Sequence, residues 1–292
     1  MPAMPRRLCR ARGLRRACLA TVLLLALSGC VTTRQAAPAA SAAPASIDSL
    51  WRDYERAVED ARVPRPARVS RELVPLAIWF DGLVWDGARQ KVLMITWTKA
   101  AWFTPGELKL GRDTWFTAAP FLQRFCRASG LQGQALDLRL EQRLGLPPNG
   151  AHDAFAEVWI DPADIFRPCP DPEIGDRECQ VNLTTGTADR AAACPWSAAL
   201  QQQVSGTFVT VSRQHLDWMC SNWTATYPPG KPRESYPWTA LGYTYDWSSS
   251  SPNHFGDSEF VAPAGTAVVV RGVVPTGQYC APAGQGLGVA GQ

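Results

Sequence analysis

Histidine and closely spaced cysteines are both scarce in this chain of 292 residues. Its only histidines are His152, His215 and His254, and no two cysteines stand two to four residues apart. Structural zinc sites draw their ligands from such close pairs, so we expect no metal site. The sequence also lacks a Walker loop, a dinucleotide fingerprint between a predicted strand and helix, and a Gly-x-Ser-x-Gly elbow. We therefore expect no cofactor and no serine-hydrolase motif.

The excess of positive over negative charge is confined to one end of the sequence. Residues 1–29 carry six arginines and no acidic residue, and the rest of the chain carries 23 basic and 26 acidic side chains. The formal net charge of +3 therefore comes from the N-terminal segment. Because the remainder is slightly acidic, we expect no nucleic-acid partner.

The N-terminal segment has the pattern of an export signal. Eleven mostly apolar residues, 17–27, follow the arginines, a length typical of a signal peptide and too short to span a bilayer as a helix. Leu27, Ser28, Gly29 and Cys30 come next and resemble the lipobox of bacterial lipoproteins. In that family the cysteine is acylated and becomes the first mature residue. The resemblance implies a signal peptide at 1–29 and a lipid on Cys30; a simple secretory signal or an uncleaved anchor is the alternative.

The residues after the predicted lipid site favour a tether. Residues 30–46 are rich in Ala, Pro and Ser and have too little bulky apolar surface to fold. An aspartate after the lipidated cysteine commonly favours the inner membrane in this family, and here Val31 stands there. We therefore expect an outer-membrane lipoprotein that faces the periplasm or the cell surface. No later stretch is apolar enough to span a bilayer, so the lipid is the only membrane attachment that we predict.

The nine cysteines divide into two groups. Cys9 and Cys18 belong to the predicted signal peptide and Cys30 to the lipobox. Six remain for the exported part: Cys126, Cys169, Cys179, Cys194, Cys220 and Cys280. An even number in an exported chain indicates disulfide bonds, although three bridges allow 15 pairings. Cys169 and Cys179 flank a proline-rich loop and are the local pair that we expect.

Apolar periodicity predicts an α+β domain at 47–280 and a flexible tail at 281–292. Helical spacing occurs at 47–62, around Leu136, Leu140 and Leu144, and at 213–226, and a helix after Cys194 is plausible. Strand patterns occur at 73–80, 91–98, 113–118, 154–160, 207–211, 236–247, 258–261 and 266–274. The first two are predicted to form a hairpin or short meander. We expect a single disulfide-braced domain with antiparallel strands and short helices.

Aromatic residues and carboxylates provide the candidate sites. All twelve tryptophans follow residue 50, and they suit either a core or a platform for glycans. Glu157 lies between Phe155 and Trp159 on one predicted strand face, where a carboxylate could act as a general acid. Asp246, His254 and Glu259 fall close together with aromatic residues in the last quarter, and they are further catalytic candidates. The alternative is that the aromatics pack the sheet and the polar loop between them is merely exposed.

One short segment suggests a specific family. Residues 258–266, Ser-Glu-Phe-Val-Ala-Pro-Ala-Gly-Thr, resemble the glutamate-bearing strand of ADP-ribosyltransferase toxins. There the glutamate binds a ribose hydroxyl beside the nicotinamide bond. The family's arginine and Ser-Thr-Ser strand have no match in this sequence, so the resemblance extends to Glu259 alone.

Two functions follow as competing hypotheses. The first is a non-enzymatic lipoprotein whose domain binds an envelope glycan or protein. The second is an extracytoplasmic enzyme, a carboxylate-based hydrolase or a toxin-like transferase, that uses Glu259 or Glu157. A cavity shared by Glu157, Asp246, His254 and Glu259 would favour the enzyme, and their dispersal would favour the binding protein.

Overall fold

The computed structural model describes residues 46–183 and 208–282. The predicted signal peptide, Cys30, most of the tether, Cys194 with the helix after it, and nearly all of the tail lie outside these residues. No helix in the described ranges is long and apolar enough to cross a membrane.

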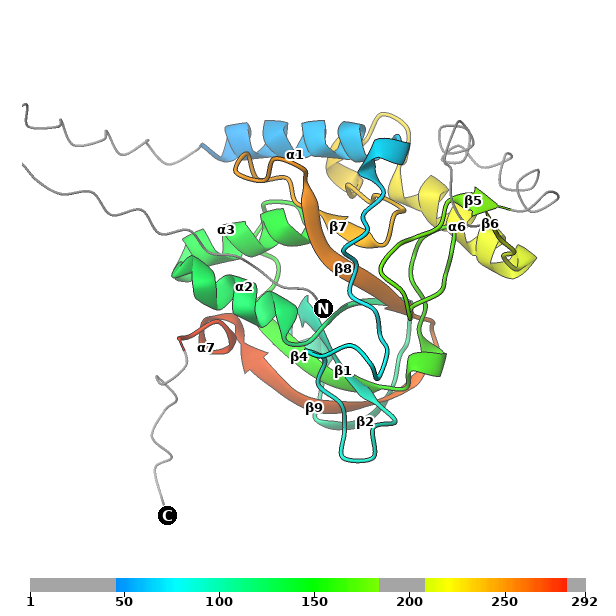
Figure 1. Cartoon of the computed structure of the whole chain (residues 1–292). Helices are drawn as coiled ribbons and strands as arrows, with labels where there is room; N and C mark the ends of the chain where they lie inside the picture. Colours follow the sequence, from blue (N-terminus) through cyan, green and yellow to red (C-terminus); the bar gives the residue numbers. More distant parts are fainter. Residues whose placement is uncertain (1–45, 184–207, 283–292) are drawn as a thin grey trace, which may run out of the picture. The chain divides into compact units, whose positions relative to one another are not determined.

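A seven-stranded antiparallel sheet forms the centre of the described domain (Figure 1). Its strand order is β2-β9-β4-β1-β3-β8-β7. The strands are β1 (Val92–Thr98), β2 (Gly106–Lys109), β3 (Thr114–Ala118), β4 (Ala154–Ile160), β7 (Tyr243–Tyr245), β8 (Phe255–Ala262) and β9 (Ala267–Pro275). A separate parallel pair joins β5 (Asn182–Leu183) to β6 (Phe208–Val209). The predicted α+β class with antiparallel strands is confirmed.

Five α-helices and four 3-10 turns accompany the strands in the described residues. The α-helices are α1 (Ile47–Ala61), α2 (Phe121–Ser129), α3 (Gly133–Leu144), α6 (Arg213–Thr226) and α7 (Thr276–Tyr279). The 3-10 turns are η1 (Pro66–Arg68), η2 (Ala100–Trp102), η3 (Pro162–Asp164) and η4 (Pro232–Glu234). Serine side chains cap two of the α-helices: Ser46 accepts from the Ser49 N–H before α1, and Ser212 accepts from the His215 N–H before α6.

The two faces of the sheet are covered by different kinds of structure. Ile95 and Phe155 pack with Leu122 of α2 and Leu140 of α3, so helices cover one face. On the opposite face, Met94, Val158 and Phe260 pack with Leu76, Leu110 and Ile165, which belong to connecting segments. Because β1 is buried on both faces, its sequence is apolar at nearly every position instead of alternating.

A third core lies at the β7 end of the domain. Tyr54 and Val58 of α1 and Trp223 of α6 pack there with Tyr243 and Trp247. Tyr243, Tyr245 and Trp247 are almost fully buried in this core. These three aromatic residues, Tyr243, Tyr245 and Trp247, therefore serve packing.

Most of the predicted elements are present, but two expectations about strands are wrong. Residues 73–80 form no strand, so the hairpin with 91–98 does not exist. Instead, the backbone N–H groups of Leu73 and Leu76 bond to Arg177 O and Ile174 O, and the segment covers the sheet. Its apolar character reflects this burial. Of the predicted strand at 236–247, only Tyr243–Tyr245 is extended, and β2 and α2 were not predicted.

Disulfide bonds brace the domain, and five cysteines of the described residues take part in them. Cys169 bonds to Cys179, which confirms the predicted local pair, and Cys126 bonds to Cys280 across 154 residues. Cys220 is also disulfide-bonded. The Cys169–Cys179 bond closes a short loop that contains Glu173 and Asp176. The fully buried Arg167, just before this loop, donates to the carbonyls of Glu173 (3.1 Å) and Asp176 (3.0 Å).

Candidate functional site

The central feature of the sheet is a fork between β1 and β3. These strands pair only at Met94↔Ala118 and Ile95↔Thr117. Beyond that point residues 96–98 of β1 and 114–116 of β3 are not paired with each other, and both segments line a cavity of about 910 Å³. The cavity therefore occupies the place where the sheet has separated.

Aromatic side chains form much of the cavity wall. Trp97, Trp115 and Trp238 line its inner part, and Trp102 and Tyr236 line it from more exposed positions, with 51% and 50% of their surfaces accessible. Trp115 meets Trp238 edge to face, with ring centroids 5.8 Å apart. Such walls offer flat apolar faces to a ligand with rings.

Glu259 supplies a carboxyl group at one side of the cavity. It lies on β8 directly opposite Thr117 of β3, and only 5% of its surface is exposed. Burial raises its pKa to about 8, against the opposing effects of the Trp238 indole and the Arg167 charge. The carboxyl is therefore mainly protonated at neutral pH. Neither its Oε1 nor Trp238 Nε1 has a well-aligned hydrogen-bond partner among residues 46–183 and 208–282.

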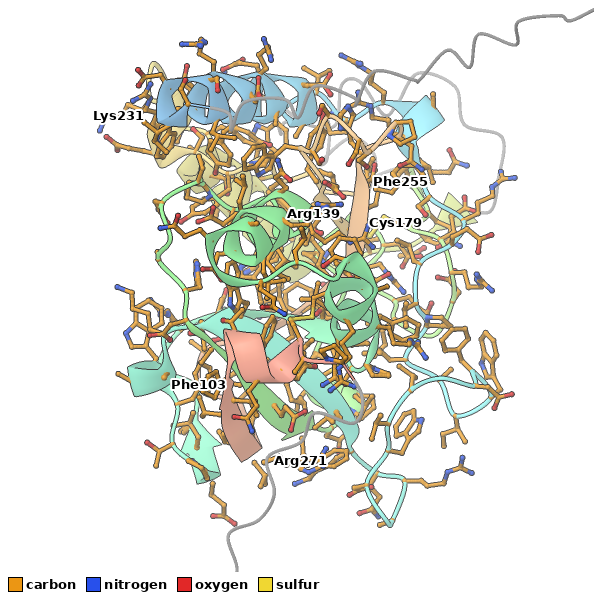
Figure 2. All side chains as sticks on the ribbon, turned by 90° about the vertical axis from the view of Figure 1, so that its left-hand side faces the viewer. Phe103, Arg139, Cys179, Lys231, Phe255 and Arg271 are labelled. Atoms are coloured by element: carbon orange, nitrogen blue, oxygen red, sulfur yellow. A yellow bond between two sulfur atoms is a disulfide. The ribbon has the colours of Figure 1, made fainter. Side chains whose placement is uncertain are left out.

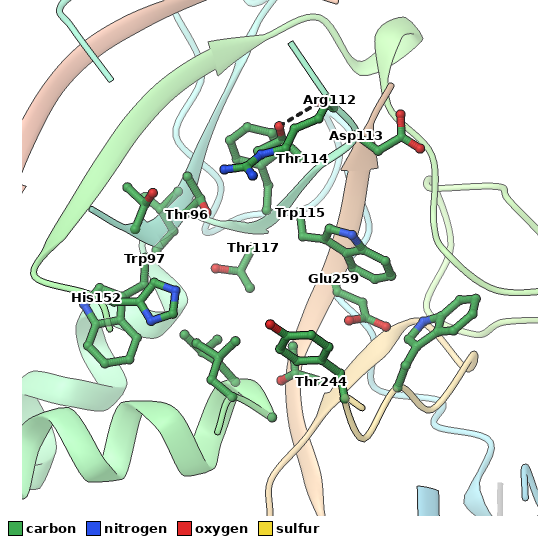
Figure 3. A pocket seen from close by; sticks show the side chains of 18 of the residues that line it. Thr96, Trp97, Arg112, Asp113, Thr114, Trp115, Thr117, His152, Thr244 and Glu259 are labelled. Atoms are coloured by element: carbon green, nitrogen blue, oxygen red, sulfur yellow. Dashed lines mark hydrogen bonds between the residues drawn. The ribbon is translucent and has the colours of Figure 1, made fainter. Parts of the chain in front are cut away.

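His152 lies on the other side of the cavity, with Thr117 between it and Glu259 (Figure 3). Its ring packs against Trp97, with centroids 5.0 Å apart. Burial, aided by the positive charge of Lys99, lowers the pKa of His152, so the ring is neutral at neutral pH. His152 Nδ1 and Thr117 Oγ1 are buried and have no hydrogen-bond partner in the part of the chain that the structure describes.

Unpaired polar atoms are concentrated at this cavity. Of eight buried side-chain nitrogen and oxygen atoms without a partner in the described residues, four belong to cavity-lining residues. They are Glu259 Oε1, Thr117 Oγ1, His152 Nδ1 and Trp238 Nε1. Buried polar groups in proteins are generally hydrogen-bonded, so a cluster of unpaired ones beside a cavity indicates a place for a polar ligand or water.

The other candidates from the last quarter of the sequence have structural partners. Asp246 is 1% exposed and accepts two hydrogen bonds from Arg139, at 3.1 and 2.7 Å. Arg139 projects from α3 and is labelled in Figure 2. His254 Nδ1 bonds to the Asp246 carbonyl at 2.9 Å, and its ring stacks on Tyr245. These contacts join β7 and β8 to α3.

Glu157 occupies a third location. It lies on β4 in the same row as Ile95, and its carboxylate is 3.8 Å from the guanidinium of Arg271. Of the four predicted candidates, Glu259 alone is among the described residues that line the cavity. The structure therefore brings Asp246 and His254 together but places Glu157 and Glu259 elsewhere, so the four candidates share no cavity.

Sequence reasoning missed His152 and Thr117 as members of this site. His152 follows a Pro-Pro-Asn-Gly-Ala segment, and Thr117 lies on a predicted strand where its hydroxyl is an unremarkable feature. The available signal was a polar residue on a strand whose neighbouring residues are mostly buried. This signal applies to both Thr117 and Glu259.

Comparisons with protein-family models, curated proteins and solved structures find no match to this chain. Within the described residues, no group of three or more His, Cys, Asp or Glu side chains is placed to hold a metal ion.

Proposed function

We propose that the protein is an outer-membrane lipoprotein whose folded domain binds a glycan in the β1–β3 fork. The observation that carries the binding proposal is the cluster of four unpaired polar atoms inside an aromatic-walled cavity. Sugars combine ring faces that stack on aromatic side chains with hydroxyl and amide groups that need hydrogen bonds. The cavity offers both kinds of contact.

The size of the site supports a ligand of two rings. His152 packs on Trp97 of β1, and Glu259 lies on β8, two strands away in the sheet order. Neighbouring strands lie about 5 Å apart, so a ligand that reaches both groups must be about 10 Å long or more. Glu259, when protonated, would donate a hydrogen bond at one end, and the neutral His152 would accept or donate one at the other.

A titration with the neutral disaccharide N,N′-diacetylchitobiose tests this proposal. Binding should change the tryptophan fluorescence, because Trp97, Trp115 and Trp238 line the site. Glu259→Gln and His152→Ala should each weaken binding by about tenfold, the effect of one buried hydrogen bond. Glu157→Gln is the matched control, since this glutamate lies outside the cavity, and its affinity should equal that of the wild type. Absence of binding by the folded wild-type protein to this and longer chitooligosaccharides would contradict the proposal.

A glycoside hydrolase that uses Glu259 as general acid is the second candidate. A carboxyl with a pKa of about 8 retains its proton at neutral pH, as such an acid must. The usual mechanism also needs a second carboxylate. Of the other acids that line the cavity, Asp113 accepts from Trp218 Nε1 and the Ala264 N–H, and Glu234 pairs with Lys231. Because both are engaged, we favour binding; release of new reducing ends from chitooligosaccharides, lost in Glu259→Gln, would favour the hydrolase.

The membrane part of the proposal rests on the lipobox and has its own test. Cys30→Ala should move the protein from the membrane fraction to the soluble periplasmic fraction, because the lipid is the only attachment proposed. Ser28→Thr, which keeps Cys30, serves as a control. A Cys30→Ala protein that still sediments with membranes in high salt would contradict lipid anchoring and leave the glycan proposal intact.

A further inference from the structure

The mouth of the cavity carries positive charge that forms no ion pair with an acid of the described residues. Lys109 and Arg112 line the cavity, and Lys99 lies next to them over the exposed ring of Trp102. None of the three forms an ion pair with a described residue. Three unpaired cations therefore lie around one opening.

Trp102 keeps two of these cations at the mouth. The guanidinium of Arg112 lies 4.7 Å from the centre of its ring, and the ammonium of Lys99 lies 5.6 Å from it. Contacts of this kind favour positions over the ring face and limit the freedom of long side chains. In Figure 3 the Arg112 side chain extends along the edge of the cavity near Thr96 and Thr114.

No nearby acid among the described residues forms an ion pair with these three cations. Asp113 points away from the cavity centre in Figure 3, and its two oxygens accept from Trp218 Nε1 and the Ala264 N–H. Asp153 accepts from the Ala100 N–H, and Glu107, on the same strand as Lys109, makes no ion pair with it. The interior, with protonated Glu259 and neutral His152, adds little charge of its own.

We infer that the glycan in the cavity carries an anionic group, a carboxylate or a phosphate, which Lys109 and Arg112 bind at the mouth. This inference rests on the proposed glycan site and specifies its ligand as an acidic saccharide. The rings occupy the aromatic interior, and the anion remains at the mouth, where it keeps part of its hydration. Lys99 adds to the positive potential from beyond Trp102.

The test compares saccharides that differ by one anionic group. The neutral probe is N,N′-diacetylchitobiose, and the carboxylate probe is the disaccharide of N-acetylglucosamine and N-acetylmuramic acid, which adds a lactyl carboxylate. A second pair, N-acetylglucosamine and its 1-phosphate, tests the phosphate. At low salt at least one anionic probe should bind about tenfold more tightly than its neutral partner, and 0.5 M NaCl should reduce this preference. The pair that shows the preference identifies the anion.

Variants then assign the preference to the mouth. Lys109→Gln with Arg112→Gln should abolish the preference and leave the affinity for the neutral probe within twofold, whereas Lys109→Arg with Arg112→Lys should retain it. Arg52→Gln with Lys91→Gln removes the same two charges away from the cavity and should leave the preference unchanged.

The outcomes separate this inference from the proposed function. Equal affinity for the charged and neutral probes, or a preference that survives Lys109→Gln with Arg112→Gln, would overturn the anionic group and leave the glycan site standing. Failure of every probe, neutral and charged, would overturn both. The melting temperature of each variant is measured first, so that only folded protein enters the comparison.

Discussion

Two buried carboxyl groups on neighbouring parts of the sheet have very different surroundings. Asp246 accepts both hydrogen bonds of the Arg139 guanidinium and one from the Ser248 N–H. Glu259 faces a cavity, has the Trp238 indole beside it but no cationic donor bonded to it among the described residues, and retains its proton because burial raises its pKa to about 8. Burial alone therefore does not distinguish the two acids; the completeness of their partners separates Asp246 from Glu259, the acid that we propose binds a ligand.

The contrast extends to the regions around them. In the region where α3 meets β7 and β8, the Arg143 guanidinium bonds to Asp257 (2.6 Å) and to the Phe255 carbonyl, and Trp247 Nε1 donates to Glu141 O and Leu146 O. At the fork, by comparison, four polar atoms have no partner within the described ranges. We therefore expect substitutions in the α3–β7–β8 region to change stability and substitutions at the fork to change binding.

The largest loss of stability is expected at Gly256. A methyl group there would overlap Thr244 Oγ1 and the Thr244 carbonyl and would lie 2.5 Å from the Arg143 carbonyl. Backbone atoms cannot yield cheaply, so Gly256→Ala should lower the free energy of unfolding by about 3 kcal/mol. Urea denaturation measures this value, with Gly87→Ala as control because its added methyl group would meet no atom within 4 Å. A Gly256→Ala protein as stable as the control would mean that this region is loosely packed.

A smaller loss is expected at Asp246. Asp246→Asn removes the charge that faces Arg139, and because that arginine is partly exposed the cost should be about 2 kcal/mol. Asp217→Asn, which breaks an exposed pair with Arg213, should cost less than about 0.5 kcal/mol. Affinity for N,N′-diacetylchitobiose should be unchanged in both folded variants. Loss of binding without loss of stability in Asp246→Asn would reverse the roles that we assign to the two acids.

Glu259 should make stability depend on pH in a defined direction. The unfolded carboxyl ionises near its ordinary pKa of 4.5, whereas the folded one retains its proton up to about 8. The contribution of Glu259 to the free energy of unfolding therefore falls as pH rises from about 4.5 to 8 and is constant above that range. Glu259→Gln removes the effect, so the variant should gain at least about 1 kcal/mol relative to the wild type between pH 5 and pH 8.

The remaining titrating groups do not disturb this comparison. His152 and His215, whose pKa values are lowered by burial, are present in both proteins and cancel in the difference. A difference that is constant from pH 5 to pH 8 would show that Glu259 titrates normally.

The smallest change in stability is expected at Thr117. Thr117→Val keeps the shape of the side chain and removes a hydroxyl that has no partner, so stability should change by less than about 0.5 kcal/mol. Affinity for the neutral disaccharide should nevertheless fall several-fold. Thr239→Val is the contrasting variant, because the Thr239 hydroxyl donates to the Tyr243 carbonyl and its loss should lower stability and leave affinity unchanged.

Much of the fold could be predicted because its elements have local signals. Helical spacing and Ser212 predicted α6 at the residues where it occurs, and alternation predicted β4. The prediction of a strand at 73–80 was wrong, because a segment buried against the face of a sheet has the same apolar run as a strand buried within it. The strands β2 and β7 are only four and three residues long, too short for a clear period.

The site was less predictable than the fold because it depends on contacts between distant residues. The sequence indicated Glu259, but it gave equal weight to Asp246, whose partner Arg139 is 107 residues away. His152 lies at the site because its ring packs against Trp97 at the edge of the fork, a contact between residues 55 positions apart in the sequence. The fork itself comes from the early separation of β1 and β3, which no single segment of sequence encodes.

The protonation of Glu259 is the point on which the contrast between the two regions depends most directly. Carbon-13 NMR of the glutamate side-chain carboxyls, with Glu259 assigned from the Glu259→Gln variant, measures its pKa in the folded protein. We predict that Glu259 has a pKa of about 8 and that this pKa changes when N,N′-diacetylchitobiose is added. A value near 4.5, unaffected by the disaccharide, would contradict it.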